Sequence, residues 1–182
     1  MTRRIHKINA GVDGKLAPDW YTEDEQIGWI SMGYSVGDPT EMTNEEIRKR
    51  DDSPNQQTSR FLGAHENDDY NLHVDDEVIA YAPARQILIG VGTIIGDPDY
   101  RKNPSVVLDD PHPHWRKVRW QDWSRPVRLS DLPDSLKTGK NKVYPRQSIE
   151  RYYGDLDLLK RVLQKTEPLN FESLTWQLSP ES

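Results

Sequence analysis

Trp29 and Ser31 are the residues whose types and spacing first suggest chemistry in this chain. They stand two positions apart in a short apolar run, IGWISM, that Gly33 closes. Side chains two positions apart on an extended strand lie on the same face of it, so an indole ring and a hydroxyl are expected to project together. An aromatic plane beside a hydrogen-bonding group suits a planar ligand. Tyr34, directly after this run, is a further aromatic candidate.

No familiar catalytic motif accompanies this pair. The sequence has no cysteine, and a P-loop, a dinucleotide-binding fingerprint and a nucleophile elbow are all missing. Residues 98–102 invite comparison with a nuclease motif, but the second acidic residue that such a motif places before a lysine is absent. His112 and His114 flank Pro113 without the spacing of a metal site. We therefore expect a non-catalytic binding domain that uses no metal ion and no cofactor.

The composition is that of one modest domain with many polar aromatic residues. A chain of 182 residues can bury a core, and its 6 tryptophans and 8 tyrosines, against 2 phenylalanines, favour a recognition surface. We expect a domain over residues 1–166 and a tail or linker over residues 167–182. No signal segment and no run of about 18 apolar residues is present. A cytoplasmic protein without a membrane partner is therefore expected.

Charge is distributed unevenly along the sequence. The net charge is −6, yet residues 116–151 hold ten basic and four acidic side chains, a net of +6 that leaves −12 for the rest. A basic face on an acidic protein can meet phosphates while the other side repels them. Such contacts position a nucleic acid without reading its sequence. We expect them from Arg116, Lys117, Arg119, Lys140, Lys142 and Arg146.

The elements that position these residues are expected to be mainly strands. Apolar runs bounded by turn residues predict strands over residues 3–10, 27–32, 77–82 and 87–95, of which the last two are rich in β-branched residues. Val118 and Trp120 alternate with Lys117 and Arg119, which predicts a strand over 115–123 with one apolar and one cationic face, and a last strand is expected over 125–129. The third and fourth should form an antiparallel hairpin, in which Gly90 and Gly92 leave room for a bulky side chain to pack across. A capping box begun by Thr43 and apolar residues at helical spacing predict helices over about 43–50, 54–65, 145–153 and 155–165. The fold class is therefore α+β.

The order of these segments resembles the EVE domain, a family of the PUA superfamily that is related to YTH domains. The resemblance rests on IGWISMG at 27–33, VDDEVIAY at 74–81, IGVGTI at 89–94 and VRW at 118–120, with a helical insert after the first. NKVYPRQSI at 141–149 is similar to the end of EVE-like modules in McrB-like and Mrr-like modification-dependent restriction proteins. The resemblance covers about residues 3–152 and implies a small, curved, mixed or antiparallel barrel-like sheet flanked by helices.

Members of this family recognise modified bases. The resemblance therefore implies a reader that flips a methylated base out of double-stranded DNA into an aromatic cage, where stacking contributes about 1–3 kcal/mol per base. Trp29 matches the cage tryptophan of the related YTH pattern, in which Trp-Ser-Thr stands where this chain has Trp29-Ile30-Ser31. The candidate base-binding residues are Trp29, Ser31, Asn9, Tyr34, Tyr100, Trp115 and Trp120.

Several roles within this set stay open. Either Tyr100 or Trp115 is the second wall of the cage, Asn9 reads the base edge or forms a turn, and Trp120 faces the base or belongs to the core. The resemblance implies nuclease or GTPase domains or subunits of a restriction system as partners. Two other functions remain possible on the sequence: a PUA-like RNA-binding module, and a small-molecule binder or enzyme that uses the pocket near Trp29. Which modification is read, N6-methyladenine, 5-methylcytosine or 5-hydroxymethylcytosine, depends on pocket depth.

Overall fold

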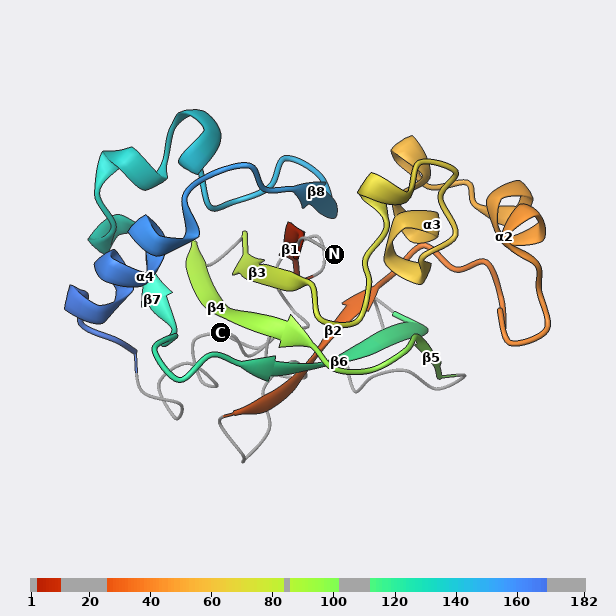
Figure 1. Cartoon of the computed structure of the whole chain (residues 1–182), viewed down its shortest axis with the longest axis horizontal. Coiled ribbons are helices and arrows are strands. Elements are labelled where there is room, and N and C mark those ends of the chain that lie inside the picture. The colour runs from red at the N-terminus through yellow and green to blue at the C-terminus, as the bar shows by residue number, and fades with distance from the viewer. Residues whose placement is uncertain (1–2, 11–25, 84–85, 102–111, 170–182) are drawn as a thin grey trace.

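The computed structural model describes residues 3–10, 26–83, 86–101 and 112–169, and within these ranges the fold is α+β. A mixed sheet of eight strands curls into a half-barrel, and three short α-helices accompany it (Figure 1). The strands are β1 (Ile5–Asn9), β2 (Ile27–Met32), β3 (Glu77–Ala82), β4 (Ile87–Ile94), β5 (Asp99–Tyr100), β6 (His114–Trp120), β7 (Val127–Arg128) and β8 (Ile149–Arg151). The described helices are α2 (Asn44–Arg50), α3 (Gln57–Leu62) and α4 (Leu156–Lys165).

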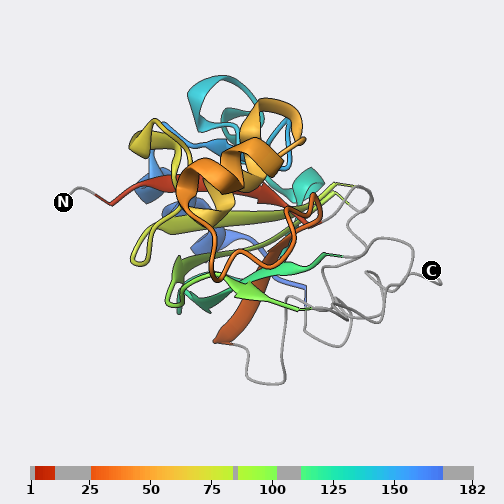
Figure 2. The same ribbon diagram turned by 90° about the vertical axis from the view of Figure 1, so that its right-hand side faces the viewer.

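The sheet follows the order β2-β6-β4-β3-β1-β8, with β5 beside β6 and β7 beside β4. β1 and β3 run parallel and the other pairs are antiparallel. The predicted hairpin of residues 77–82 and 87–95 is confirmed as the β3–β4 pair. α2 and α3 lie on one side of the sheet, and α4 with the turns before β8 lies on the other (Figures 1 and 2).

Two hydrophobic cores form because side chains alternate along each strand. Val78 and Ala80 of β3 pack in one core with Phe61 of α3, whereas Ile79 between them packs in the other core with Leu159 of α4. α4 can supply this second core because its leucines recur at helical spacing. The Asp155 carboxylate caps α4 by accepting hydrogen bonds from the backbone N–H groups of its first turn.

Gly92 provides the predicted room for a bulky side chain. It stands opposite Trp120 in the β4–β6 register, and a Cβ at Gly92 would lie 3.0 Å from Cε3 of that indole and 3.0 Å from the carbonyl oxygen of Arg119. Trp120 is 3% exposed and belongs to the core. Of the two roles that the sequence left open for Trp120, the structure shows the core one.

Two of the predicted helices are wrong in part or in whole. Residues 145–153 hold no helix; Ile149–Arg151 forms β8 because its backbone pairs with β1. Residues 54–65 start as a 3-10 turn in which Asn55 and Gln56 have φ of 55° and 53°. α3 therefore begins only at Gln57, and it ends at Gly63, which has a φ of 76°. The helix predicted after Thr43 is confirmed, with the Thr43 hydroxyl accepting from the backbone N–H of Glu46.

The remaining strand predictions differ at their ends. The strand expected over 115–123 is β6, which stops at Trp120 because a turn follows, closed by a hydrogen bond from Ser124 N to Gln121 O. Of the expected tail, residues 167–169 are described, and Leu169 N donates to Pro126 O; residues 170–182 lie outside the described ranges, so the tail stays a prediction. None of the described helices has the length and apolar character that crossing a membrane requires.

Candidate functional site

A cavity of about 740 Å³ lies where two diagonal corners of the curled sheet meet. One corner holds the end of β2 and the start of β6, which run antiparallel; the other holds the ends of β1 and β3 and the start of β8. Twist bends such corners toward each other. We call this cavity the corner pocket. The described residues that line it include Asn9, Ser31, Tyr34, Gln57, His112, Arg146 and Gln147.

Asn9 supplies an oriented hydrogen-bond acceptor at the end of β1. Its Nδ2 donates to the carbonyl oxygen of Gln147 at 2.9 Å. Since a carbonyl only accepts, the amide nitrogen must face it, and this fixes the position of Oδ1. That oxygen is buried and has no hydrogen-bond partner in the described structure. Buried acceptors are nearly always paired, so the unpaired Asn9 Oδ1 is a candidate acceptor for a ligand that displaces the atoms now covering it. The edge-reading role of Asn9 stays a prediction.

Ser31 and His112 meet on the β2 side of the corner pocket. Ser31 Oγ lies 2.8 Å from His112 Nδ1, and both residues are buried. The imidazole of His112 packs against the backbone at Gly33, where a Cβ would lie 2.7 Å from Nε2 and would clash with the ring. From the sequence, His112 was a candidate only for a metal site, and its spacing to His114 did not fit one. No local pattern could have paired it with Ser31, since the two stand 81 positions apart.

Tyr34 brings an exposed aromatic ring to the corner pocket. It is 43% exposed, but its backbone is held in place because its carbonyl oxygen accepts from Thr58 Oγ1 at 2.8 Å. Two residues later, Val36 N donates to Nε2 of the buried His114 at 3.3 Å. A ring on an anchored backbone can stack on a ligand at little entropic cost.

The opposite wall carries the positive charge of the rim. Arg146 lines the corner pocket with a side chain that is 80% exposed and 3.9 Å from the Glu150 carboxylate. Lys140 and Lys142 precede it along the same segment, and Lys142 Nζ lies 4.4 Å from the centre of the Tyr144 ring. None of the described lining residues is a carboxylate. An anionic group at this rim would therefore meet attraction from Arg146, which the nearby Glu150 carboxylate partly offsets.

Trp29 and Trp115 do not line the corner pocket in the described structure. The guanidinium carbon of Arg101 lies 4.3 Å from the centre of the Trp29 ring and 4.5 Å from that of Trp115. Trp115 is 1% exposed, and its Nε1 donates to the carbonyl oxygen of His112. Arg101 thus stacks on both rings, and the structure does not place them in the corner pocket. The cage role of Trp29 stays a prediction.

Tyr100 also packs away from the corner pocket. Its ring lies 5.7 Å from that of the buried His114, and it is not among the lining residues. Of the seven residues proposed for base binding, the structure brings together Asn9, Ser31 and Tyr34.

Arg116 cannot serve as the phosphate contact that the sequence predicted. It is 3% exposed, and its guanidinium donates to the carbonyl oxygens of Gly96, Phe61 and Leu72 at 3.1, 3.2 and 2.6 Å. Burial lowers the pKa of Arg116 to about 10, which leaves it charged at neutral pH. Its position in a strand of alternating basic residues gave no sign of this, because the carbonyls come from distant segments.

Lys117 and Arg119 are exposed, as the alternation in β6 predicted. They stand opposite Trp29 and Ile27 in the register with β2, and directly opposed residues share a face of the sheet. Lys117 Nζ lies 6.0 Å from the Trp29 ring centre. These two cations therefore belong to the Trp29 side of the sheet rather than to the rim with Arg146.

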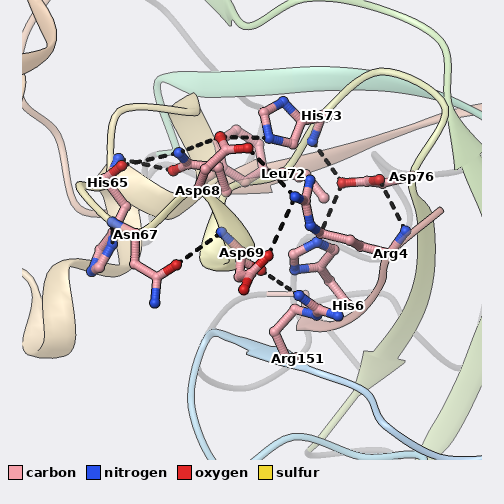
Figure 3. Close-up of polar contacts among 12 residues, drawn as sticks. Arg4, His6, His65, Asn67, Asp68, Asp69, Leu72, His73, Asp76 and Arg151 are labelled. Carbon is pink, nitrogen blue, oxygen red and sulfur yellow. Dashed lines mark hydrogen bonds and ion pairs between the residues drawn. The ribbon is translucent and has the colours of Figure 1, made fainter. Parts of the chain in front are cut away.

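A second cavity of about 600 Å³ lies where β1 and β3 begin, beside the polar network drawn in Figure 3. The Asp76 carboxylate accepts from the backbone N–H groups of Arg4 and His73 and lies 3.4 Å from His6 Nε2. Arg4 also lies 3.4 Å from both Asp68 and Asp69. Burial lowers the pKa of His6, although Asp76 opposes the shift. These hydrogen bonds and ion pairs join the start of β1 to the 68–76 segment.

Among the described residues, no group of three or more His, Cys, Asp or Glu side chains converges. No protein-family model matches the chain, and no curated protein matches it. Protein Atu2648 from Agrobacterium tumefaciens has a solved structure that is similar over 92% of this chain and 100% of its own, with 11% identity and a TM-score of 0.38. A similarity that weak carries no argument, and the site is interpreted from its own geometry.

Proposed function

We propose that this chain is a non-catalytic reader of modified DNA, an EVE-like module that holds a flipped, methylated base in the corner pocket. The observation that carries the proposal is the oriented acceptor Asn9 Oδ1 in a cavity with an exposed Tyr34 ring. A base that leaves the duplex needs an aromatic surface for its face and polar atoms for its edge. A volume of about 740 Å³ falls within the usual range of ligand sites, roughly 300–1,000 Å³.

The proposed DNA backbone contacts involve fewer residues than the sequence suggested. Arg146 stands at the rim of the corner pocket, and Lys140 and Lys142 lie on the segment that leads to it. These three would hold the phosphates next to the flipped nucleotide. Cleavage of the DNA would be the task of nuclease or GTPase domains or subunits of a restriction system.

Equilibrium binding to a matched set of duplexes tests this function. The set holds one sequence unmodified and with N6-methyladenine, 5-methylcytosine or 5-hydroxymethylcytosine, together with an RNA of that sequence, all at one salt concentration. We expect one modified duplex to bind at least tenfold more tightly than the unmodified one. Equal weak binding to all duplexes would reject the proposal, and a preference for the RNA would favour a PUA-like RNA-binding module.

A further inference from the structure

Gln57, the first residue of α3, is a buried amide that lines the corner pocket. It is 3% exposed, and its Oε1 accepts from the backbone N–H of Ile149 at 3.1 Å. Because that N–H can only donate, the atom facing it must be the oxygen, and the amide nitrogen must point elsewhere. The side chain cannot flip without leaving the first residue of β8 unpaired.

The two N–H groups of Gln57 Nε2 are the unused part of this side chain. No described group accepts a hydrogen bond from them, and Nε2 is not among the fully buried side-chain atoms that lack a partner. Nε2 therefore retains some access to solvent, and the open space that Gln57 borders is the corner pocket. Water, or a ligand group in the corner pocket, can therefore accept from these two N–H groups.

The local backbone holds Gln57 in this position. Asn55 and Gln56, directly before it, both adopt positive φ, and such conformations persist only where the surrounding structure enforces them. Asn55 Nδ2 donates to Gln147 Oε1 at 3.2 Å, which joins this turn to the wall that also orients Asn9. The side chains of Gln57 and Asn9 are thus both oriented by backbone groups of residues 147–149, where β8 begins.

We propose that Gln57 and Asn9 together read one polar edge of the ligand, with Gln57 Nε2 donating to an acceptor atom and Asn9 Oδ1 accepting from an N–H. Adenine and cytosine present this combination on their Watson–Crick edge as an amino group beside a ring nitrogen. The inference deepens the proposed function and rests on the same pocket. Gln57 would then be a specificity-determining residue of this pocket.

The variant Gln57→Glu tests the role of the donor. A carboxylate keeps an oxygen for Ile149 N but replaces the pocket-facing NH₂ with an acceptor. The probes are adenosine and cytidine, each paired with the analogue in which C–H replaces the ring nitrogen, 1-deazaadenosine and 3-deazacytidine, and binding is measured by NMR titration. We expect at least one nucleoside to bind the unaltered protein, and its deaza analogue and the Gln57→Glu variant each to lose at least tenfold in affinity.

The combination of variant and analogue decides whether the two changes remove the same interaction. Coupled groups give non-additive losses, so the deaza analogue should bind Gln57→Glu no more weakly than the parent nucleoside does. Gln56→Glu introduces the same charge one position earlier, at a residue that does not line the pocket, and should leave affinity unchanged. Thermal unfolding of both variants checks that the fold is retained.

Several results would overturn the inference: no nucleoside binding at millimolar concentration, additive losses, an unchanged affinity of Gln57→Glu, or an equal loss in Gln56→Glu. The test is separable from that of the proposed function. Nucleosides that bind as described, combined with duplexes that show no preference for a modified base, would reject the DNA reader and keep the edge-reading pair. A preference for a modified duplex that is unchanged in Gln57→Glu would keep the DNA reader and reject the edge-reading pair.

Discussion

Two side-chain amides in this protein have a fixed orientation, because a backbone group forms a hydrogen bond with one of the two polar atoms of each amide. Gln147 O orients the Asn9 amide and Ile149 N orients the Gln57 amide. Neither arrangement depends on a charge, so both persist across a wide range of pH. A buried histidine next to the same pocket behaves differently.

His114 should make the stability of the fold depend on pH. It is fully buried, its Nε2 accepts from Val36 N, and burial lowers its pKa to about 4. The folded protein therefore resists a proton that the unfolded chain accepts below about pH 6.5. The stabilisation is complete above pH 6.5 and is lost as pH falls toward 4, by up to about 3 kcal/mol. Urea unfolding at pH 7.5, 6 and 5 measures it.

The variant His114→Gln isolates this contribution. A glutamine retains an acceptor for Val36 N but does not titrate in this range. We expect the free energy of unfolding to fall less steeply with decreasing pH in the variant than in the unaltered protein. Parallel pH profiles for the two proteins would show that the acid sensitivity arises elsewhere, for example at the buried His6.

At the scale of elements, β2, β5 and β6 are joined by the stack of Arg101 on Trp29 and Trp115. Arg101 directly follows β5, and its guanidinium lies within 4.5 Å of both ring centres. A cation over an aromatic ring contributes about 0.5–2 kcal/mol, the larger values applying where water is excluded. The stack therefore holds the short β5 onto the sheet.

Trp29→Leu should weaken the fold and leave the ligand site intact. We expect a loss of about 1–2 kcal/mol in the free energy of unfolding, from the lost ring contact and lost burial, with no change in affinity for the preferred duplex. Tyr34→Leu is the comparison variant. It removes an exposed ring that lines the corner pocket, so it should reduce affinity for the preferred duplex and leave the free energy of unfolding nearly unchanged. A Trp29→Leu variant that is stable but no longer discriminates modified from unmodified DNA would show that Trp29 is part of the base-binding cage.

For the molecule as a whole, the uneven charge predicts which side meets DNA. Residues 116–151 carry a net of +6 in a chain of net −6, but the structure divides these cations among separate places. Lys140, Lys142 and Arg146 lie on or before the pocket wall, whereas Lys117 and Arg119 lie on the Trp29 side of the sheet. Arg116 is buried.

Lys140→Ala combined with Lys142→Ala should weaken modified and unmodified duplexes alike. Each phosphate contact contributes about 0.9 to the slope of log K against log salt, so the slope should become shallower by up to about 2. Binding measured at four or more salt concentrations gives it. Lys117→Ala with Arg119→Ala removes the same charge from the Trp29 side and should leave the slope unchanged; the opposite pattern would move the DNA path to that side.

The sequence by itself determined the elements whose signals are local. β-Branched runs predicted β3 and β4, and alternating apolar and basic residues predicted β6. The hydroxyl of Thr43 and the apolar spacing of α4 predicted two helices. Hydrogen bonds and side-chain periodicity within a few residues produce all of these patterns. β8 was missed since its partner, β1, lies more than 130 positions earlier. Residues 149–151 carry no signal of their own for that pairing.

Only the tertiary structure decided which candidates share a site. Asn9, Ser31 and Tyr34 were named from the sequence, but Gln57 and His112 joined them because sheet twist brings two diagonal corners together. Arg116 was expected to contact phosphates because it is basic, but its guanidinium donates to three backbone carbonyl groups. Trp29 was expected in the base cage from the resemblance, and the structure places Arg101 on its ring. Residue type and spacing indicate which interactions a side chain is able to form. The partners that it contacts lie on distant segments, and strand pairing and packing decide which of these segments come close.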